Sequence, residues 1–273
     1  VEKDKSYHIW AKYNEKDKLK DMWMPKGALL KTHTIEEVSI DYSKYSHRPP
    51  LNHQIEAIEK LVGSKRFILA DDMGLGKTTA TIIAALETGV KKILIICPAS
   101  LKLNWQREIE NYTDRSIYIA EGKKFSTEDD FVIVNYDILK NFYDIKNKDT
   151  SLITKGEFDL IILDEAHYVS NGQAKRTKLV NSFCKSPKYL WLLTGTPMTN
   201  RPMNYFNLLS LIESPVSQNW MAYAIRYCQG YQFTAGKRKI WNVSGASNLE
   251  ELRDRTSRQV LRRLKTDVLD LPD

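Results

Sequence analysis

The residues best suited to chemistry in this 273-residue chain lie in the segment 69–78, which reads LADDMGLGKT. Gly74 and Gly76 allow a tight turn whose backbone N–H groups can point at phosphate oxygens. Lys77 has the charge to neutralise β- and γ-phosphates, and Thr78 has the hydroxyl to bind Mg²⁺. An apolar run precedes the segment and a helix-forming stretch follows it, as a phosphate-binding loop requires. The segment therefore predicts a site for ATP with Mg²⁺.

One position departs from the usual phosphate-loop pattern. That pattern has a glycine five residues before Gly76, where this chain has Asp71. The Gly-x-Gly-Lys-Thr core is intact and an apolar run and a helix flank it, so we still expect the loop to bind nucleotide. The expected nucleotide-binding residues are Met73, Gly74, Leu75, Gly76, Lys77, Thr78 and Thr79.

A second apolar run, Leu160–Leu163, ends in Asp164 and Glu165. In open α/β sheets, ligands bind at the carboxyl edge of the strands, where such acids would lie. We expect Asp164 to hold Mg²⁺ with Thr78, and Glu165 to polarise the attacking water as general base. Two acids after a strand can also form a simple turn, but together with the phosphate loop they favour catalysis. The expected catalytic residues are Lys77, Asp164 and Glu165.

A third motif, Thr194-Gly195-Thr196, follows the apolar Leu190–Leu193 and would lie at the same sheet edge. Its uncharged hydroxyls are suited to relaying a hydrogen-bond change between sites. His167, just after the acidic pair, is either a similar coupling residue or an ordinary polar residue. Taken alone, Thr194 to Thr196 would be interpreted as a strand-to-loop turn.

Between residues 66 and 212, short apolar runs alternate with helix-forming stretches. Uninterrupted apolar runs indicate strands buried on both faces, and the alternation indicates crossover units around a mostly parallel sheet. The expected strands are 67–70, 93–97, 131–134, 160–163 and 190–193, and the expected helices are 51–61, 78–87, 101–110 and 177–183. The predicted fold class is α/β, with a central parallel sheet flanked by helices.

The two ends of the chain differ from this middle part. Residues 1–48 are lysine-rich with weak periodicity, and we assign them as an N-terminal extension of unknown role that ends at Pro49-Pro50. Residues 216–273 are interpreted as an appended protrusion and not as a continuation of the sheet. The expected elements are short strands near 35–40, a helix at 220–228, a hairpin over 231–243, and a helix from the capping-box residue Ser247 to about Leu269.

The chain carries a formal net charge of +7, which favours anionic partners such as nucleic acid but also suits a lysine-rich solvated surface. The expected last helix carries Arg253, Arg255, Arg258, Arg262, Arg263 and Lys265, either as a phosphate-facing stripe or as a solvated face. Three cysteines without Cys-x-x-Cys spacing argue against a disulfide framework or a zinc site. No apolar run is long enough to span a membrane, so we expect a soluble intracellular protein.

Together the three motifs resemble the first motor lobe of Swi/Snf-type ATPases of helicase superfamily two. The resemblance covers about 51–273, and the features of the tail around Trp241 and 245–252 resemble the annealing-helicase branch, whose members rewind or remodel forked DNA. It implies a RecA-like, P-loop ATP-binding lobe over 49–215. It also implies that 216–273 holds a helical and hairpin protrusion and leads into a second lobe beyond Asp273.

The resemblance also implies roles for residues outside the three motifs. Gln54 would read the adenine edge, and contacts to the nucleic-acid backbone would come from Ser100, Lys102, Trp105 and Tyr136. The implied function is an ATP-dependent, monomeric DNA translocase or helicase-like motor on duplex or forked DNA. Because arginines from the second lobe would act on the γ-phosphate, we expect this chain by itself to hydrolyse ATP slowly.

Three other functions stay open at this point. One is an RNA helicase or restriction-type motor, which would use the same core chemistry. Another is a small-molecule kinase or GTPase switch; a guanine-reading Asn-Lys-x-Asp is absent, and the Asp164-Glu165 pair suits hydrolysis better than transfer to a small substrate. The last is a binding module with a degenerate nucleotide site.

Overall fold

The computed structural model describes residues 7–11, 22–25, 35–197, 201–236 and 238–268. Its centre is a seven-stranded sheet with the strand order β11-β3-β8-β7-β4-β6-β5, in which every neighbouring pair is parallel. The strands are β3 Arg66–Leu69, β4 Ile93–Cys97, β5 Ile117–Ile119, β6 Phe131–Asn135, β7 Leu160–Leu163, β8 Tyr189–Leu193 and β11 Val260–Leu261. The predicted α/β class with a parallel sheet is confirmed.

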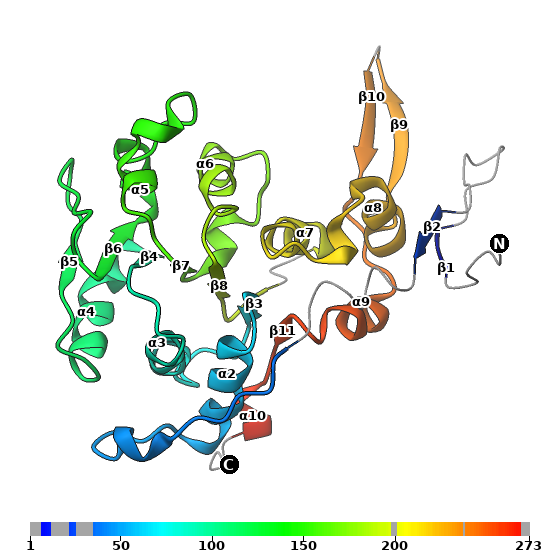
Figure 1. Cartoon of the computed structure of the whole chain (residues 1–273). Coiled ribbons are helices and arrows are strands. Elements are labelled where there is room, and N and C mark those ends of the chain that lie inside the picture. The colour runs from blue at the N-terminus through cyan, green and yellow to red at the C-terminus, as the bar shows by residue number, and fades with distance from the viewer. Residues whose placement is uncertain (1–6, 12–21, 26–34, 198–200, 237, 269–273) are drawn as a thin grey trace, which may run out of the picture.

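Helices cover both faces of this sheet (Figure 1). They are α2 Asn52–Val62, α3 Lys77–Glu87, α4 Lys102–Glu110, α5 Leu152–Lys155, α6 Lys175–Phe183, α7 Pro202–Leu211, α8 Trp220–Cys228, α9 Leu249–Thr256 and α10 Lys265–Val268. The four helices expected in the α/β unit are therefore present as α2, α3, α4 and α6, and each end lies within two residues of the predicted one. Within the described ranges, no helix has the length and apolar content needed to cross a membrane.

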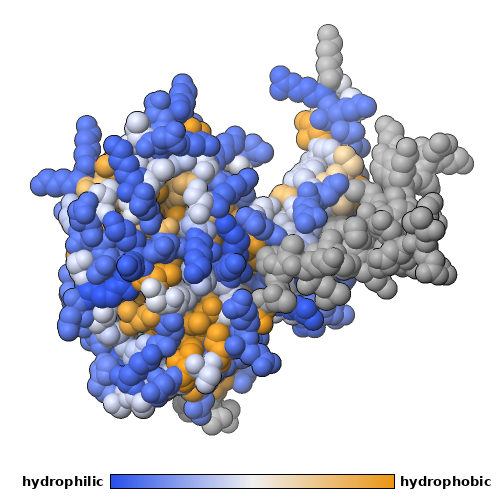
Figure 2. Space-filling view, viewed as in Figure 1, coloured by the Kyte–Doolittle hydropathy of each residue, from blue (hydrophilic) through white to orange (hydrophobic). Residues whose placement is uncertain are grey.

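Strand residues alternate between two hydrophobic cores because successive side chains of a strand point to opposite faces. Ile93 and Ile95 belong to the core under α2, α3 and α4, whereas Leu94 and Ile96 belong to the core under α6, α7 and α8. Both faces of the sheet are buried, which explains why β4 and β7 are apolar at every position and β6 at every position except its last residue, Asn135. On the face that Figure 2 shows, hydrophilic residues predominate between smaller hydrophobic patches.

The hairpin predicted in the tail is present as β9 Tyr231–Ala235 paired antiparallel with β10 Arg238–Asn242. It stands away from the sheet beside α8 (Figure 1). Gly236 at its tip has φ 62°, a left-handed conformation that glycine adopts without steric cost. This part of the chain is the expected protrusion.

The expected helix from Ser247 to about Leu269 is wrong. Helix α9 begins only after Asn248 and ends at Thr256, and Val260–Leu261 then joins the sheet as β11, pairing with Ile68 and Leu69 of β3. Leu261 is buried there, so the adjacent apolar pair serves the sheet edge and not a helix face. The tail is thus partly a continuation of the sheet, and its arginines form no single helical stripe.

The N-terminal prediction also needs correction. Residues 35–40 form no strand, although the N–H of Glu36 does donate to the carbonyl of Gly63 at 3.0 Å. Instead, β1 Tyr7–Ala11 and β2 Met22–Pro25 form a short antiparallel hairpin. The rest of the extension up to residue 34 lies outside the described residues.

Candidate functional site

The three motifs meet at one edge of the sheet because their strands are neighbours. Strand β8 lies between β3 and β7, with Leu193 opposite Leu69 and Leu192 opposite Leu163. All three strands run in the same direction, so the segments that follow them leave at the same edge. The phosphate loop, the acidic pair and the Thr194 motif are therefore adjacent, although they are far apart in the sequence.

The phosphate loop has the backbone that phosphate binding needs. Gly74 and Gly76 have φ angles of 88° and 75°, which only glycine adopts easily. A Cβ atom at Gly76 would lie 2.0 Å from Nε2 of Gln54, so no larger residue fits without displacing that side chain. Helix α3 begins at Lys77, and the free N–H groups and positive dipole end of a helix N-terminus attract anions.

Lys77 is held within the loop and within the field of the acidic pair. Its Nζ donates to the carbonyls of Asp71 at 2.7 Å and Asp72 at 3.1 Å. Burial lowers the pKa of Lys77, and the nearby charges of Glu165 and Asp164 oppose that shift. The structure thus brings together the ammonium and the two carboxylates, as the sequence analysis expected. Their catalytic roles stay predictions.

Asp164 is buried and fixed by donors on both of its oxygens. Its Oδ2 accepts from Nε1 of Trp105 at 2.8 Å, and its Oδ1 accepts from the N–H of Glu165 at 2.9 Å. Burial raises the pKa of this carboxyl, and the bond from Trp105 counters the rise. Mg²⁺ is usually held by one or two carboxylates together with phosphates and water, and Asp164 with the Thr78 hydroxyl is a donor set that fits this chemistry.

Glu165 has a backbone conformation that is costly for its residue type. Its φ and ψ are 49° and 51°, in the left-handed region, where a residue with a Cβ is strained. Such strain is typical of positions where function requires a particular side-chain direction. Nδ1 of His167 lies 3.1 Å from Oε2 of Glu165, so His167 contacts the expected general base directly.

Trp105 and Tyr136, which were expected to contact the nucleic-acid backbone, have buried side chains. Trp105 is 0% exposed and Tyr136 is 3% exposed. Both act instead on Asp164, because the hydroxyl of Tyr136 donates to the Asp164 carbonyl at 2.8 Å. Ser100 is exposed as expected, whereas Nζ of Lys102 donates to the carbonyl of Ala120 at 3.0 Å.

The third motif packs against the phosphate loop. Thr194 is buried, and its hydroxyl accepts from the N–H of Thr196 at 3.1 Å. A Cβ atom at Gly195 would lie 3.1 Å from Cγ of Met73. A change in the loop at Met73 would therefore be felt at Gly195, which is consistent with the coupling role expected for this motif.

Gln54 lies against the loop, with both ends of its amide engaged. Its Oε1 accepts from the N–H of Leu51 at 2.9 Å, and its Nε2 donates to the carbonyl of Leu75 at 3.4 Å. Nε2 of His53 lies 2.9 Å from the same Leu75 carbonyl. In this arrangement Gln54 braces the phosphate loop, and its reading of adenine stays a prediction.

Comparison with known proteins identifies the family. A family model described as the SNF2-related domain matches residues 53–273. The chain belongs to the SNF2-related family. The family resemblance inferred from the motifs is therefore confirmed.

Among SNF2-related proteins, a *Caenorhabditis elegans* homolog of SWI/SNF-related matrix-associated actin-dependent regulator of chromatin subfamily A-like protein 1 is 34% identical, over 76% of this chain and 30% of its own length. The *Bos taurus* DNA annealing helicase and endonuclease ZRANB3 is 33% identical, over 75% of this chain and 20% of its own. The chain thus spans less than a third of either relative.

A solved structure shows the same fold. The *Sulfolobus solfataricus* SWI2/SNF2 ATPase core in complex with dsDNA matches with a TM-score of 0.64 at 24% identity, over 86% of this chain and 49% of that one.

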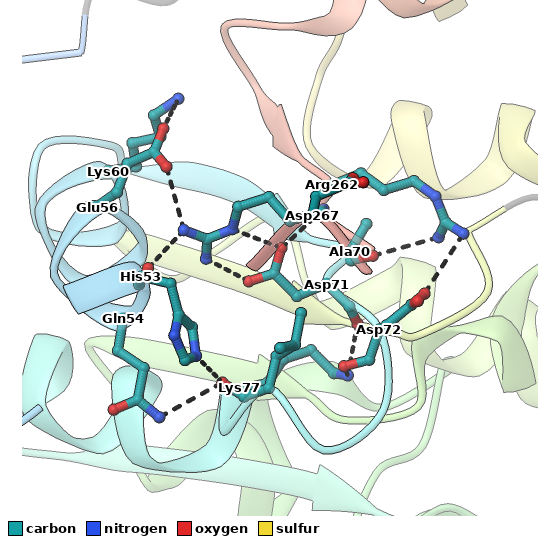
Figure 3. A network of polar contacts seen from close by, with 12 residues as sticks. His53, Gln54, Glu56, Lys60, Ala70, Asp71, Asp72, Lys77, Arg262 and Asp267 are labelled. Atoms are coloured by element: carbon teal, nitrogen blue, oxygen red, sulfur yellow. Dashed lines mark hydrogen bonds and ion pairs between the residues drawn. The ribbon is translucent and has the colours of Figure 1, made fainter. Parts of the chain in front are cut away.

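Two arginines, Arg262 and Arg263, hold this SNF2-related site together, and this role was not predicted from the sequence. Asp71, the residue that departs from the phosphate-loop pattern, is 2% exposed and accepts from Arg263 through both carboxylate oxygens, with Nε to Oδ1 at 3.1 Å (Figure 3). Arg263 also donates to the carbonyl of His53 and to Glu56 of α2. The carboxylate at position 71 therefore attaches the tail to the loop, which accounts for the missing glycine.

Arg262 extends the same attachment to the third motif. Its Nη1 donates to the carbonyl of Ala70 at 3.3 Å (Figure 3). The same atom donates to the carbonyl of Gly195 at 3.1 Å, so Arg262 bridges the ends of β3 and β8. The N–H of Lys265 donates to Asp72 at 3.2 Å. The only sequence signal for these contacts was the unexplained acid at position 71.

Proposed function

We propose that this chain is the first RecA-like lobe of an ATP-driven motor that moves along or remodels duplex DNA. The observation that carries the proposal is that the adjacent parallel strands β3, β8 and β7 bring Lys77, at the N-terminus of α3, to the same sheet edge as Asp164 and Glu165. The SNF2-related family and the relatives named as annealing helicases support it. The protein would work as a soluble intracellular monomer together with a second RecA-like lobe.

In this proposal, the glycine turn and the N-terminus of α3 bind the phosphates of ATP, and Lys77 neutralises the terminal ones. Thr78 and Asp164 would hold Mg²⁺, which when bound supplies further charge neutralisation at the β- and γ-oxygens. Glu165 orients the water and accepts its proton. Trp105 and Tyr136 act as positioning residues, because they fix the carboxylate and the carbonyl of Asp164.

Hydrolysis by this lobe alone should be slow. Arginine side chains supplied from elsewhere are worth about 10³–10⁵ in rate in related phosphoryl-transfer enzymes. The contacts of Arg262 and Arg263 commit both guanidinium groups to the phosphate loop and its neighbours. We propose that the rate-enhancing arginines come from the second lobe, as the family resemblance implies.

The decisive experiment is nucleotide binding with a matched pair of variants. A fluorescent ATP analogue with Mg²⁺ should bind Lys77→Ala at least about tenfold more weakly than wild type, since a hydrogen bond from a charged group is worth about 1.5–3 kcal/mol. Lys91→Ala, which removes an exposed lysine before β4, should bind like wild type. Equal affinity of both variants would exclude the proposed site.

The choice of DNA over RNA needs the complete two-lobed protein. Its ATP turnover should rise with duplex DNA and stay near the basal rate with duplex RNA of the same length. Stimulation by RNA alone would make the protein an RNA motor, while leaving the nucleotide site itself unchallenged.

A further inference from the structure

A cavity of about 550 Å³ opens between α6 and the 3-10 helix Tyr136–Asn141 that follows β6. We call it the α6 pocket. Four cations line it, Lys140, Lys175, Arg176 and Lys178, together with one acid, Asp137, which pairs with Arg176 at 2.5 Å and leaves the three lysines as the unneutralised charges of the lining. The three lysines are exposed. Figure 2 shows a mainly hydrophilic surface over α5 and α6. A cluster of like charges around a cavity concentrates anions there.

The floor of the α6 pocket is apolar and aromatic. Tyr136, Ile145 and Leu179 line it. The ring of Tyr136 stacks on that of Tyr168 at 5.4 Å and 11°, and the guanidinium of Arg176 lies 5.8 Å from the Tyr136 ring and 5.3 Å from the Tyr168 ring. Tyr136 is only 3% exposed, so the accessible plane that this stack offers to the pocket is the guanidinium of Arg176, whose side chain is 34% exposed. Guanidinium planes are platforms on which unpaired bases bind in nucleic-acid-binding proteins.

We propose that the α6 pocket binds one unstacked nucleotide of a nucleic-acid strand. The base lies against the apolar floor, and the flanking phosphates contact Lys140, Lys175 and Lys178. The volume is within the range of pockets that enclose small ligands. Positive rim and flat apolar floor match the two halves of a nucleotide, whereas a simple anion would use the rim alone. The proposal rests on the proposed function, and adds Lys140, Lys175 and Lys178 to the strand-binding residues expected from the sequence.

A direct connection joins the α6 pocket to the ATP site. Tyr136 contributes its ring to the pocket, while its hydroxyl donates to the carbonyl of Asp164 at 2.8 Å. A nucleotide that shifts this ring would shift the residue expected to hold Mg²⁺. Tyr136 is thus a positioning residue between the two sites. Tyr136→Phe should keep oligonucleotide affinity but lose the effect of the oligonucleotide on the affinity for Mg²⁺–nucleotide.

The main test is charge reversal on the rim. Lys175→Glu with Lys178→Glu keeps good helix formers in α6 and places an acid in its first turn, where the helix dipole favours it. The control is Lys65→Glu with Lys91→Glu, two exposed lysines that precede β3 and β4 at the opposite sheet edge.

The probe is a fluorescein-labelled thymidine oligonucleotide, titrated with the 273-residue chain at about 0.1 M salt. Each lost phosphate contact costs a factor of about 5 on a single strand, so the rim variant should bind about 20-fold more weakly, with a salt slope lower by about 1.4. The control should stay near wild type. Equal binding of the rim and control variants would overturn the proposal.

A second probe tests the base. An abasic oligonucleotide of equal charge should bind wild type about fivefold or more weakly than the thymidine strand, because stacking contributes about 1–3 kcal/mol per base. Ile145→Trp, which fills the pocket, should abolish that difference. If polyglutamate competes as well as the thymidine strand and the abasic strand binds equally, the pocket binds acidic peptide and the proposal is wrong. The rim, control and Ile145→Trp variants should keep wild-type affinity for Mg²⁺–nucleotide; failure of wild type in that assay would instead refute the proposed function.

Discussion

Arg263→Ala should destabilise the chain strongly, because it removes the side chain that pairs with the buried carboxylate of Asp71. Asp71 is 2% exposed and accepts three hydrogen bonds from Arg263: from Nε at 3.1 Å, from Nη2, and from the backbone N–H at 3.0 Å. Alanine at position 263 would keep only the hydrogen bond from the backbone N–H. Removing one partner of a buried ion pair costs about 3–5 kcal/mol, and the Arg263 side chain is only 14% exposed, so solvent would screen little of this.

The matched control is Arg253→Ala. Arg253 is in the same tail, but its side chain is 79% exposed and its Nε lies 3.7 Å from an equally exposed Asp254. Surface pairs of this kind contribute roughly 0–1 kcal/mol, so the control should unfold like wild type. The two variants remove the same residue type and the same formal charge, so they differ mainly in the burial of the partner.

The assay is urea and thermal unfolding, followed by tryptophan fluorescence. The melting temperature of Arg263→Ala should fall by roughly 6–20 °C, given about 2–4 °C per kcal/mol for a chain of this size. Asp71→Ala combined with Arg263→Ala should be destabilised by less than the sum of the single changes, because the two side chains interact directly. Identical unfolding midpoints for Arg263→Ala and Arg253→Ala, or strict additivity in the double variant, would refute the reasoning.

Two further predictions concern the nucleotide site. Trp105→Phe removes the hydrogen bond that counters the raised pKa of Asp164, so the pKa of Asp164 should rise further above 3.8. Because Mg²⁺ needs the ionised carboxylate, the variant should lose Mg²⁺-dependent nucleotide affinity at a higher pH than wild type when the pH is lowered. An unchanged pH midpoint would contradict this. Gly76→Ala should weaken nucleotide binding about tenfold or more by calorimetric titration, because its Cβ would meet Gln54 at 2.0 Å. Gly89→Ala has a similar φ of 66° and meets nothing within 4 Å, so it should bind like wild type, and equal losses in both would argue against a steric cause.

Much of the site could be predicted because its parts are local. Each motif is an apolar strand followed directly by polar residues, and parallel strands release such residues at a common edge. That rule places Lys77, Asp164 and Glu165 at one edge of the sheet, and their closeness also depends on the strand order, in which only β8 separates β3 from β7. The same patterns predicted the sheet and its flanking helices, since the runs at β4, β6, β7 and β8 are apolar at every position.

The path of the tail and the residues that hold Asp164 in place could not be predicted in this way. Val260 and Leu261 are two residues, too few for a period, so the long helix expected there was wrong and their pairing with β3 was missed. Trp105 and Tyr136 were expected to contact nucleic acid from the family resemblance alone, and their burial could not be predicted because an aromatic residue has the same local pattern whether it is buried or exposed.

The sequence by itself determined the chemistry of this protein: a glycine turn with a lysine, an acidic pair and the strands that carry them. Tertiary structure alone decided which remote groups fix that chemistry in place, as Trp105 does for Asp164 and Arg263 for Asp71. The physical reason is that these bonds join side chains on separate elements. Whether a polar side chain is buried and which partner it meets depend on how those elements pack, and packing leaves no periodic trace in the chain.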